Sequence, residues 1–221
     1  MQKFTTPTPV TAVLDIPAGR IRFIAADRTD TTVEILPADP AKSRDTKAAE
    51  QTTAAYADGV LRIGTAPAKN RLLGQPGSVE ITVRLPAGSR IDAKAASAEL
   101  RGVGRLGDVT YEAAHGTVKL DETAAARLTL QAGDITVGSL AGPAAISTQK
   151  GDLHIDEARR GTVELATRAG HITVGAARGV SATLDAGTTL GRIHNTLKNT
   201  GTPDLTIHAT TDHGDITARS L

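Results

Sequence analysis

The chain has 221 residues and carries 25 Lys and Arg against 24 Asp and Glu, a net charge of +1. Such a balance gives no long-range field for holding nucleic acid or an anionic membrane. Cysteine is absent, which excludes disulfides and thiolate metal sites, and two Phe, two Tyr and no Trp offer little bulk for a wide core.

The N-terminal nine residues, MQKFTTPTP, contain no apolar segment of the kind that directs secretion. No run of apolar residues is long enough to span a membrane. Provided that the chain is complete, we therefore expect a cytoplasmic protein.

The first 100 residues are expected to form an N-terminal β region, because apolar and polar residues alternate there with the strand period. Two Pro-Ala-Gly segments, 17–19 and 86–88, are each expected to form a turn between two strands. The expected strands cover residues 8–16, 20–26, 31–36, 52–57, 60–64, 78–85 and 90–95.

Two other segments of this region differ from the strands. Residues 42–51 are rich in Ala, Lys, Glu and Gln and are expected to form a short helix. Residues 65–77 form the longest predicted loop, and they hold an apolar pair, Leu72 and Leu73, beside Arg71. These three residues are our candidates for contact with a partner. Alternatively, the two leucines fold over the open end or flank of the core.

Residues 101–221 repeat one phrase, a glycine followed by a polar residue and then by two apolar residues that flank a polar one. A repeated phrase of this length is typical of repeat architectures. The glycines of successive copies are 17 to 23 residues apart. They are Gly116, Gly133, Gly151, Gly170, Gly191 and Gly214.

Apolar residues recur at fixed distances from these glycines, so each repeat is predicted to be two strands joined by a tight turn at glycine. Either a β-solenoid or an antiparallel meander could use this pattern. The recurrence favours the solenoid, in which like residues such as Ile135, Leu153 and Ile172 stack in columns about 4.8 Å apart. We predict an all-β protein: a β-solenoid over 101–221, with the 1–100 region packed on or capping it in one continuous unit.

Several motifs resemble one known family over essentially the whole chain. They include IPAGRIR at 16–22, VEILPADP at 33–40, KAAEQT at 47–52, LGRIHN at 190–195 and HGDIT at 213–217. The family is the bacterial beta-strand-repeat proteins of unknown function, catalogued as "putative adhesin". The resemblance implies an all-β, solenoid-like fold, and it implies no reaction and no catalytic residues.

The Gly-Asp corners are the first candidates for a site. Asp134 and Asp152 are expected to lie one coil apart, where carboxylates could bind a hard cation such as Ca²⁺. The alternative is that each Asp caps its own turn through its own backbone. His171 takes the equivalent place in the next coil and is expected to interrupt the carboxylate series, so we expect no metal and no cofactor.

No nucleophile elbow, phosphate loop or dinucleotide fingerprint occurs in the sequence. We therefore expect no enzyme, no catalytic residue and no nucleic-acid partner. The favoured function is a scaffold that binds an unknown protein or glycan. The first alternative is self-assembly, end to end or as a dimer, through open solenoid edges, with the last coil, 214–221, as one such edge. A carbohydrate-active enzyme is the third hypothesis.

Overall fold

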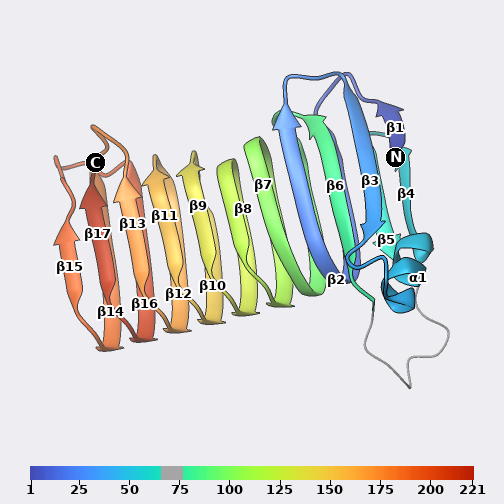
Figure 1. Ribbon diagram of the computed structural model, residues 1–221. Coiled ribbons are helices and arrows are strands. Elements are labelled where there is room, and N and C mark those ends of the chain that lie inside the picture. The colour runs from blue at the N-terminus through green and yellow to red at the C-terminus, as the bar shows by residue number, and fades with distance from the viewer. Residues whose placement is uncertain (66–76) are drawn as a thin grey trace.

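The computed structural model describes residues 1–65 and 77–221, and its strands form an elongated stack with the chain termini near opposite ends (Figure 1). The strands of these residues belong to one hydrogen-bonded network, which is the expected all-β solenoid architecture. Arg71, Leu72 and Leu73 lie outside the described residues, so their predicted role stays a prediction.

The N-terminal region mixes antiparallel and parallel pairing. β3 pairs antiparallel with β1 and with β6, and β4 pairs antiparallel with β5. β2 pairs in parallel with β5, β6 and β7, and so joins this region to the stack. The bounds are β1 Gln2–Thr5, β2 Thr11–Ala26, β3 Asp30–Pro37, β4 Thr52–Ala57, β5 Val60–Thr65 and β6 Val79–Pro86.

The two Pro-Ala-Gly segments behave differently. The expected strands 8–16 and 20–26 are one strand, β2, which continues through Pro17–Gly19, so the turn predicted there is wrong. Gly19 has φ +144° and marks a change of partner within β2. Before it the strand pairs with β5, and from Gly19 onward it pairs with β6. The second segment does form a turn, between β6 and β7, at Gly88 with φ +79°.

The predicted helix is confirmed as α1, Ser43–Gln51. Its Asp45 is buried, and one carboxylate oxygen accepts a 3.0 Å hydrogen bond from the backbone N–H of Ser78, which ties the helix to the start of β6. No helix in the described part of the chain is long and apolar enough to cross a membrane.

The stack itself has two rows of parallel strands that face each other. One row runs β8, β10, β12, β16 and β14, and the other runs β8, β9, β11, β13, β17 and β15, because β8 turns a corner and contributes to both. The bounds are β7 Arg90–His115, β8 Val118–Ala132, β9 Ile135–Leu140, β10 Ala144–Lys150, β11 Leu153–Ala158, β12 Gly161–Ala169, β13 Ile172–Ala176, β14 Ala182–Leu190, β15 Ile193–Thr196, β16 Leu205–His213 and β17 Ile216–Ser220.

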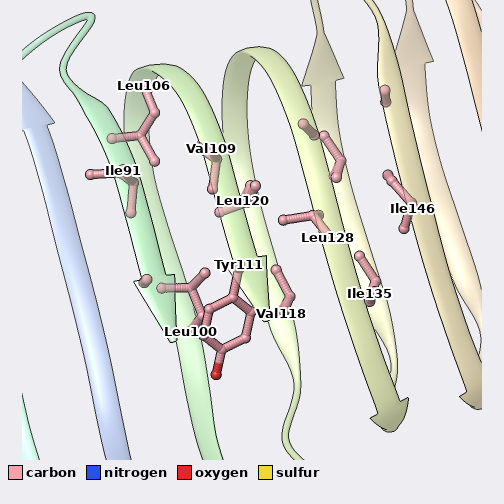
Figure 2. Close-up of a cluster of buried hydrophobic side chains, with 14 of the residues drawn as sticks. Ile91, Leu100, Leu106, Val109, Tyr111, Val118, Leu120, Leu128, Ile135 and Ile146 are labelled. Atoms are coloured by element: carbon pink, nitrogen blue, oxygen red, sulfur yellow. The ribbon is translucent and has the colours of Figure 1, made fainter. Parts of the chain in front are cut away.

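The predicted columns are confirmed. Leu153 pairs in register with Ile135 on one side and with Ile172 on the other, and all three are 1% exposed or less. Figure 2 shows how such side chains from successive coils fill the space between the rows. Each aliphatic side chain buried this fully contributes about 1.5–3 kcal/mol to folding. The core is therefore a thin, continuous apolar column rather than a wide sandwich.

Two aromatic side chains join this core, Phe23 of β2 and Tyr111 of β7, which are 0% and 1% exposed. Tyr111 also makes a polar contact. Its hydroxyl donates a 2.9 Å hydrogen bond to the backbone carbonyl of Ala98, and burial raises its pKa above the ordinary range. The phenol is thus a neutral hydrogen-bond donor that holds two parts of β7 together.

The last two coils stack in the reverse of their chain order. Ile216 of β17 pairs with Ile172 of β13 on one side and with Ile193 of β15 on the other. We call residues 205–220 the inserted coil and residues 182–197 the terminal coil. The expectation that 214–221 forms the open edge is therefore wrong, because the terminal coil lies outside it.

A property of the sequence accounts for this order. Asn195 occupies a position that points inward in other coils. If the last two coils stacked in chain order, Asn195 would be buried between Val174 and Ala218. Burying an unpaired amide costs about 1–3 kcal/mol. With the inserted coil in between, Ala218 pairs with Val174 and is 0% exposed, and Asn195 lies at the exposed end.

Candidate functional site

The candidate metal ligands at the Gly-Asp corners bind the backbone of the next coil. Asp134 accepts a 2.8 Å hydrogen bond from the backbone N–H of Asp152, and Asp152 accepts a 2.7 Å bond from the N–H of His171. The alternative that each Asp caps its own turn is wrong, because each of these bonds joins two coils. One carboxylate oxygen of each residue is already occupied by this contact.

His171 continues the series that it was expected to interrupt. Its Nδ1 lies 3.0 Å from the backbone nitrogen of Asp215 and accepts a hydrogen bond from that N–H. The acceptor role requires Nδ1 to carry no proton, so the geometry assigns the tautomer with the proton on Nε2. A histidine can replace the carboxylate here because a short acceptor at this distance is all that the neighbouring amide requires.

The series ends at the terminal coil. The backbone N–H of Arg192 donates to Asp215 Oδ1 at 2.8 Å, and the Arg192 guanidinium returns to Asp215 Oδ2 at 2.9 Å. The side-chain hydrogen bond from Arg192, followed by the backbone bond, lowers the pKa of Asp215 below its usual value. The corner ladder, as we call it, comprises Asp134, Asp152, His171, Asp215 and Arg192.

A second ladder runs inside the same corner. Thr167 donates its hydroxyl proton to the carbonyl of Gly151 at 3.1 Å, Thr211 to Gly170 at 3.1 Å and Thr188 to Gly214 at 3.0 Å. Both ladders join coils through main-chain groups. Within residues 1–65 and 77–221, no cluster of three or more His, Asp or Glu side chains could hold a metal ion.

The other histidines with carboxylate neighbours lie on outer surfaces. His154 Nε2 is 2.6 Å from Asp156 Oδ1 on the same strand, and His208 Nδ1 is 3.4 Å from Asp185 Oδ2 on the adjacent strand. Each is a pair of exposed groups without a third ligand or a neighbouring nucleophile, so neither resembles a catalytic arrangement.

The row formed by β8, β10, β12, β16 and β14 has a shallow depression on its outer face. A shallow trough of about 380 Å³ crosses β7, β8, β10 and β12. Its outward-facing wall combines hydroxyls, small side chains and charges of both signs, from Asp108, Thr110, Ala125, Arg127, Pro143, Ala145, Thr162 and Glu164. We call this surface the outer-face trough. Sequence analysis missed it because its residues come from four coils and share no local motif.

The solenoid is open at its terminal coil. Leu190 is 62% exposed and Ile193 is 46% exposed, although both belong to the repeat that buries its apolar residues elsewhere. All four residues of β15 are exposed, and its pairing partner is β17 alone within the described residues. The sequence prediction placed the open edge at the last residues of the chain, although Asn195, which stands where the repeat has an apolar residue, indicated a distorted or end-cap coil here.

Comparison with known proteins identifies one family. The model of the family described as Toastrack DUF4097 matches residues 13–220, which is nearly the whole chain. Curated proteins give no match.

Three solved structures illustrate the structural likeness. A putative adhesin from Parabacteroides distasonis has a TM-score of 0.44 and 14% identity, covering 98% of this chain and 95% of its own. One from Bacteroides fragilis has a TM-score of 0.43 and 13% identity, with coverage of 98% and 95%. A putative cell adhesion protein from Clostridium sporogenes has a TM-score of 0.41 and 10% identity, with coverage of 100% and 98%.

Proposed function

We propose, from the premise that this chain belongs to the Toastrack DUF4097 family, that it is a non-catalytic β-repeat scaffold that binds a protein or glycan on its outer surface. The observation that carries the proposal is the outer-face trough, a recessed surface built from four coils. A rigid stack of parallel strands holds such a surface in place without help from a mobile loop.

The chemistry of the trough suits an extended polar ligand. Thr110 and Thr162 supply hydroxyls that donate or accept, and Arg127 and Glu164 supply one charge of each sign. The trough has no aromatic side chain on which a sugar ring could stack. A peptide segment with alternating charge therefore fits it better than a glycan does.

The same residues argue against catalysis. Two carboxyl groups that act on a glycosidic bond must face one cleft about 5–10 Å apart. In the trough, Asp108 and Glu164 come from β7 and β12, which are separated by β8 and β10. Asp108 is moreover paired with Arg90, whose guanidinium lies 2.9 Å from its carboxylate. A carbohydrate-active enzyme has no observation in its favour.

The experiment is site-specific photo-crosslinking in bacterial cells. A photoreactive residue at Thr162 in the trough is expected to give a discrete protein adduct, and the double variant Arg127→Glu, Glu164→Lys is expected to remove it. The matched control is the same photoreactive residue at Lys119, which points outward from the other row.

Adducts that form equally from Lys119, or adducts that survive the double charge reversal, would contradict a binding role for the trough. A glycan array with the purified protein separates the two ligand classes. Specific glycan capture that is lost in the double variant would replace the peptide by a glycan. Hydrolysis of an array glycan would replace the scaffold by an enzyme.

A further inference from the structure

The open end of the solenoid exposes both the backbone and the interior of the stack. Within the described residues, β14 pairs only with β16 and β15 only with β17, so the far edge of each strand is free apart from one bond from the Ala182 N–H to the Lys198 carbonyl. Between these edges lie Leu184 and Ala186, which are partly buried, and the exposed Ile193.

Most of the usual protections of a β edge are absent from β14, and β15 is protected only by being four residues long. Natural edge strands carry lysine, proline or a bulge that prevents pairing with another chain. β14 reads ATLDAGTTL and β15 reads IHNT, with a single formal charge, at Asp185. Arg192 lies between the two strands and is engaged with Asp215. The surface is nearly neutral, so a second identical surface meets little repulsion.

The opposite end of the stack is built differently. There β3 and β6 pair antiparallel, β4 and β5 pair antiparallel, and α1 packs beside them (Figure 1). Phe4 of β1 and Tyr56 of β4 pack across this end with ring centroids 5.8 Å apart. We call this the capped end. Within the described residues β1 pairs only with β3 and β4 only with β5, so these strands also have free edges, but the edges belong to antiparallel pairs and differ from the parallel edges of β14 and β15.

The shape of the open end favours one kind of occupant. A single peptide strand can pair with β14 or with β15, but it leaves the other edge and the apolar interior uncovered. The terminal coil of a second copy covers both edges and the interior at once. With a strand rise of about 3.3 Å and facing sheets about 10 Å apart, nine residues of strand enclose roughly 300 Å² of end surface. Two such ends bury roughly 600 Å², to which outward-pointing side chains add, so we expect a weak interface that dissociates on dilution.

We propose that the terminal coil, residues 182–197, is the interface of a symmetric head-to-head dimer of this chain. A two-fold axis perpendicular to the strands places β14 antiparallel to β14 of the second copy and β15 antiparallel to β15. The interior columns then continue from one copy into the other through Leu184 and Ile193. A two-fold contact uses the same surface of both copies, so it closes at two copies. It is independent of what binds the outer-face trough.

The first test is sedimentation velocity on the purified full chain from about 1 to 200 µM, a range in which a minimal interface dissociates. The wild type is expected to pass from monomer to dimer with one midpoint. Ile193→Lys and, separately, Leu190→Lys are expected to weaken dimerisation at least tenfold. The matched control is Leu36→Lys, which adds the same charge at a 48%-exposed leucine of the capped end and is expected to leave the midpoint unchanged.

Circular dichroism melting of dilute monomer checks that each lysine variant is folded. A wild type that is monomeric at every concentration overturns the proposal. So does dimerisation that survives both lysines at the open end, or that is lost in Leu36→Lys. Continued growth beyond two copies would overturn the head-to-head geometry.

The second test uses the absence of native cysteine. A spin label at Thr196→Cys, in the terminal coil, is expected to give a short distance between copies, within about 30 Å on the strand spacing of the stack. A label at Lys3→Cys, at the capped end, is expected to lie beyond about 60 Å from its counterpart. The reverse pattern would place the interface at the capped end and overturn the proposal.

Discussion

The same repeat position has opposite environments in the middle and at the end of the stack. Ile172 and Ile193 both follow their glycine by two residues, yet Ile172 is 0% exposed and Ile193 is 46% exposed. The difference arises from the neighbours, because Ile172 has coils on both sides and Ile193 has one. Sequence position within a repeat therefore decides which way a side chain points, and the order of stacking decides whether it is buried.

The corner glycines, by contrast, have the same environment in the middle and at the end of the stack. A Cβ at Gly133 would lie 1.6 Å from the carbonyl oxygen of Gly116 on the neighbouring coil, and a Cβ at Gly191, the corner of the terminal coil, would lie 1.9 Å from that of Gly214. Glycine at both corners allows two coils to approach. Gly187, in β14 and away from the corner, has no atom within 4 Å of such a Cβ.

The largest expected effect comes from placing a charge in the column. Ile135→Asp buries a carboxylate with no partner, and we expect it to lower the free energy of unfolding by about 4 kcal/mol or more. Ile193→Asp, at the same repeat position in the terminal coil, should cost about 1 kcal/mol or less, because water reaches the carboxylate. Urea denaturation at low protein concentration, where the chain is monomeric, measures both. Equal losses would contradict the difference between middle and end.

The next effect is at the corner. Gly133→Ala forces a backbone shift between two coils at a residue whose φ is +137°, and we expect a loss of about 3 kcal/mol. The control, Gly187→Ala, should change stability by no more than about 0.5 kcal/mol, since it meets no atom. Thermal melting of the two variants side by side provides the comparison. A Gly133→Ala protein as stable as wild type would mean that the coils are not packed this closely.

The smallest effect concerns the last step of the corner ladder. Hydrogen bonds from Arg192 lower the pKa of Asp215 in the folded protein, so folding favours the ionised form. The contribution to stability is fully present above the ordinary aspartate pKa of about 3.9 and is lost as the pH falls through the lower folded value. In Arg192→Ala the backbone N–H bond remains, so the pKa should rise only part of the way back.

Carboxyl-resonance NMR titration of the wild type and Arg192→Ala measures this shift directly. Asp30, whose pKa is lowered by hydrogen bonds from Lys3 and Arg28, is the internal control, because it lies at the opposite end of the stack and its pKa should be the same in both proteins. An unchanged Asp215 pKa in Arg192→Ala would show that the guanidinium contact is not formed in solution.

Much of the fold could be predicted from local spacing. The column of Ile135, Leu153 and Ile172 follows from a constant offset from glycine, and the helix over 43–51 follows from composition. Both depend on residues close in sequence, and such patterns are read directly from the chain. The turn at Pro17–Gly19 failed because glycine there bends a strand between two partners, and the partners are distant in sequence.

The site was less predictable, for a physical reason. The residue type at Asp134 is equally suited to a metal, to its own turn or to a neighbouring amide, and only the distance to Asp152 selects among these. Likewise, Ile193 and Ile216 carry the same pattern, so local sequence does not order their coils. The one signal was Asn195, whose amide favours the exposed end of the stack over an inner coil.

The inverted order of the last two coils is the central claim, since it defines which end is open. It is tested most directly by pairs of engineered cysteines in this cysteine-free chain. Thr173 and Thr217 are register partners on adjacent strands β13 and β17, whereas Thr173 and His194 are separated by the inserted coil. Neighbouring strands are about 4.8 Å apart, within the range of Cα separations that a disulfide bridges, and strands two apart are not.

Mild oxidation followed by peptide mass spectrometry should therefore find an intramolecular disulfide in the Thr173→Cys, Thr217→Cys protein and none in the Thr173→Cys, His194→Cys protein. A disulfide between residues 173 and 194 instead would place the coils in chain order and contradict the account.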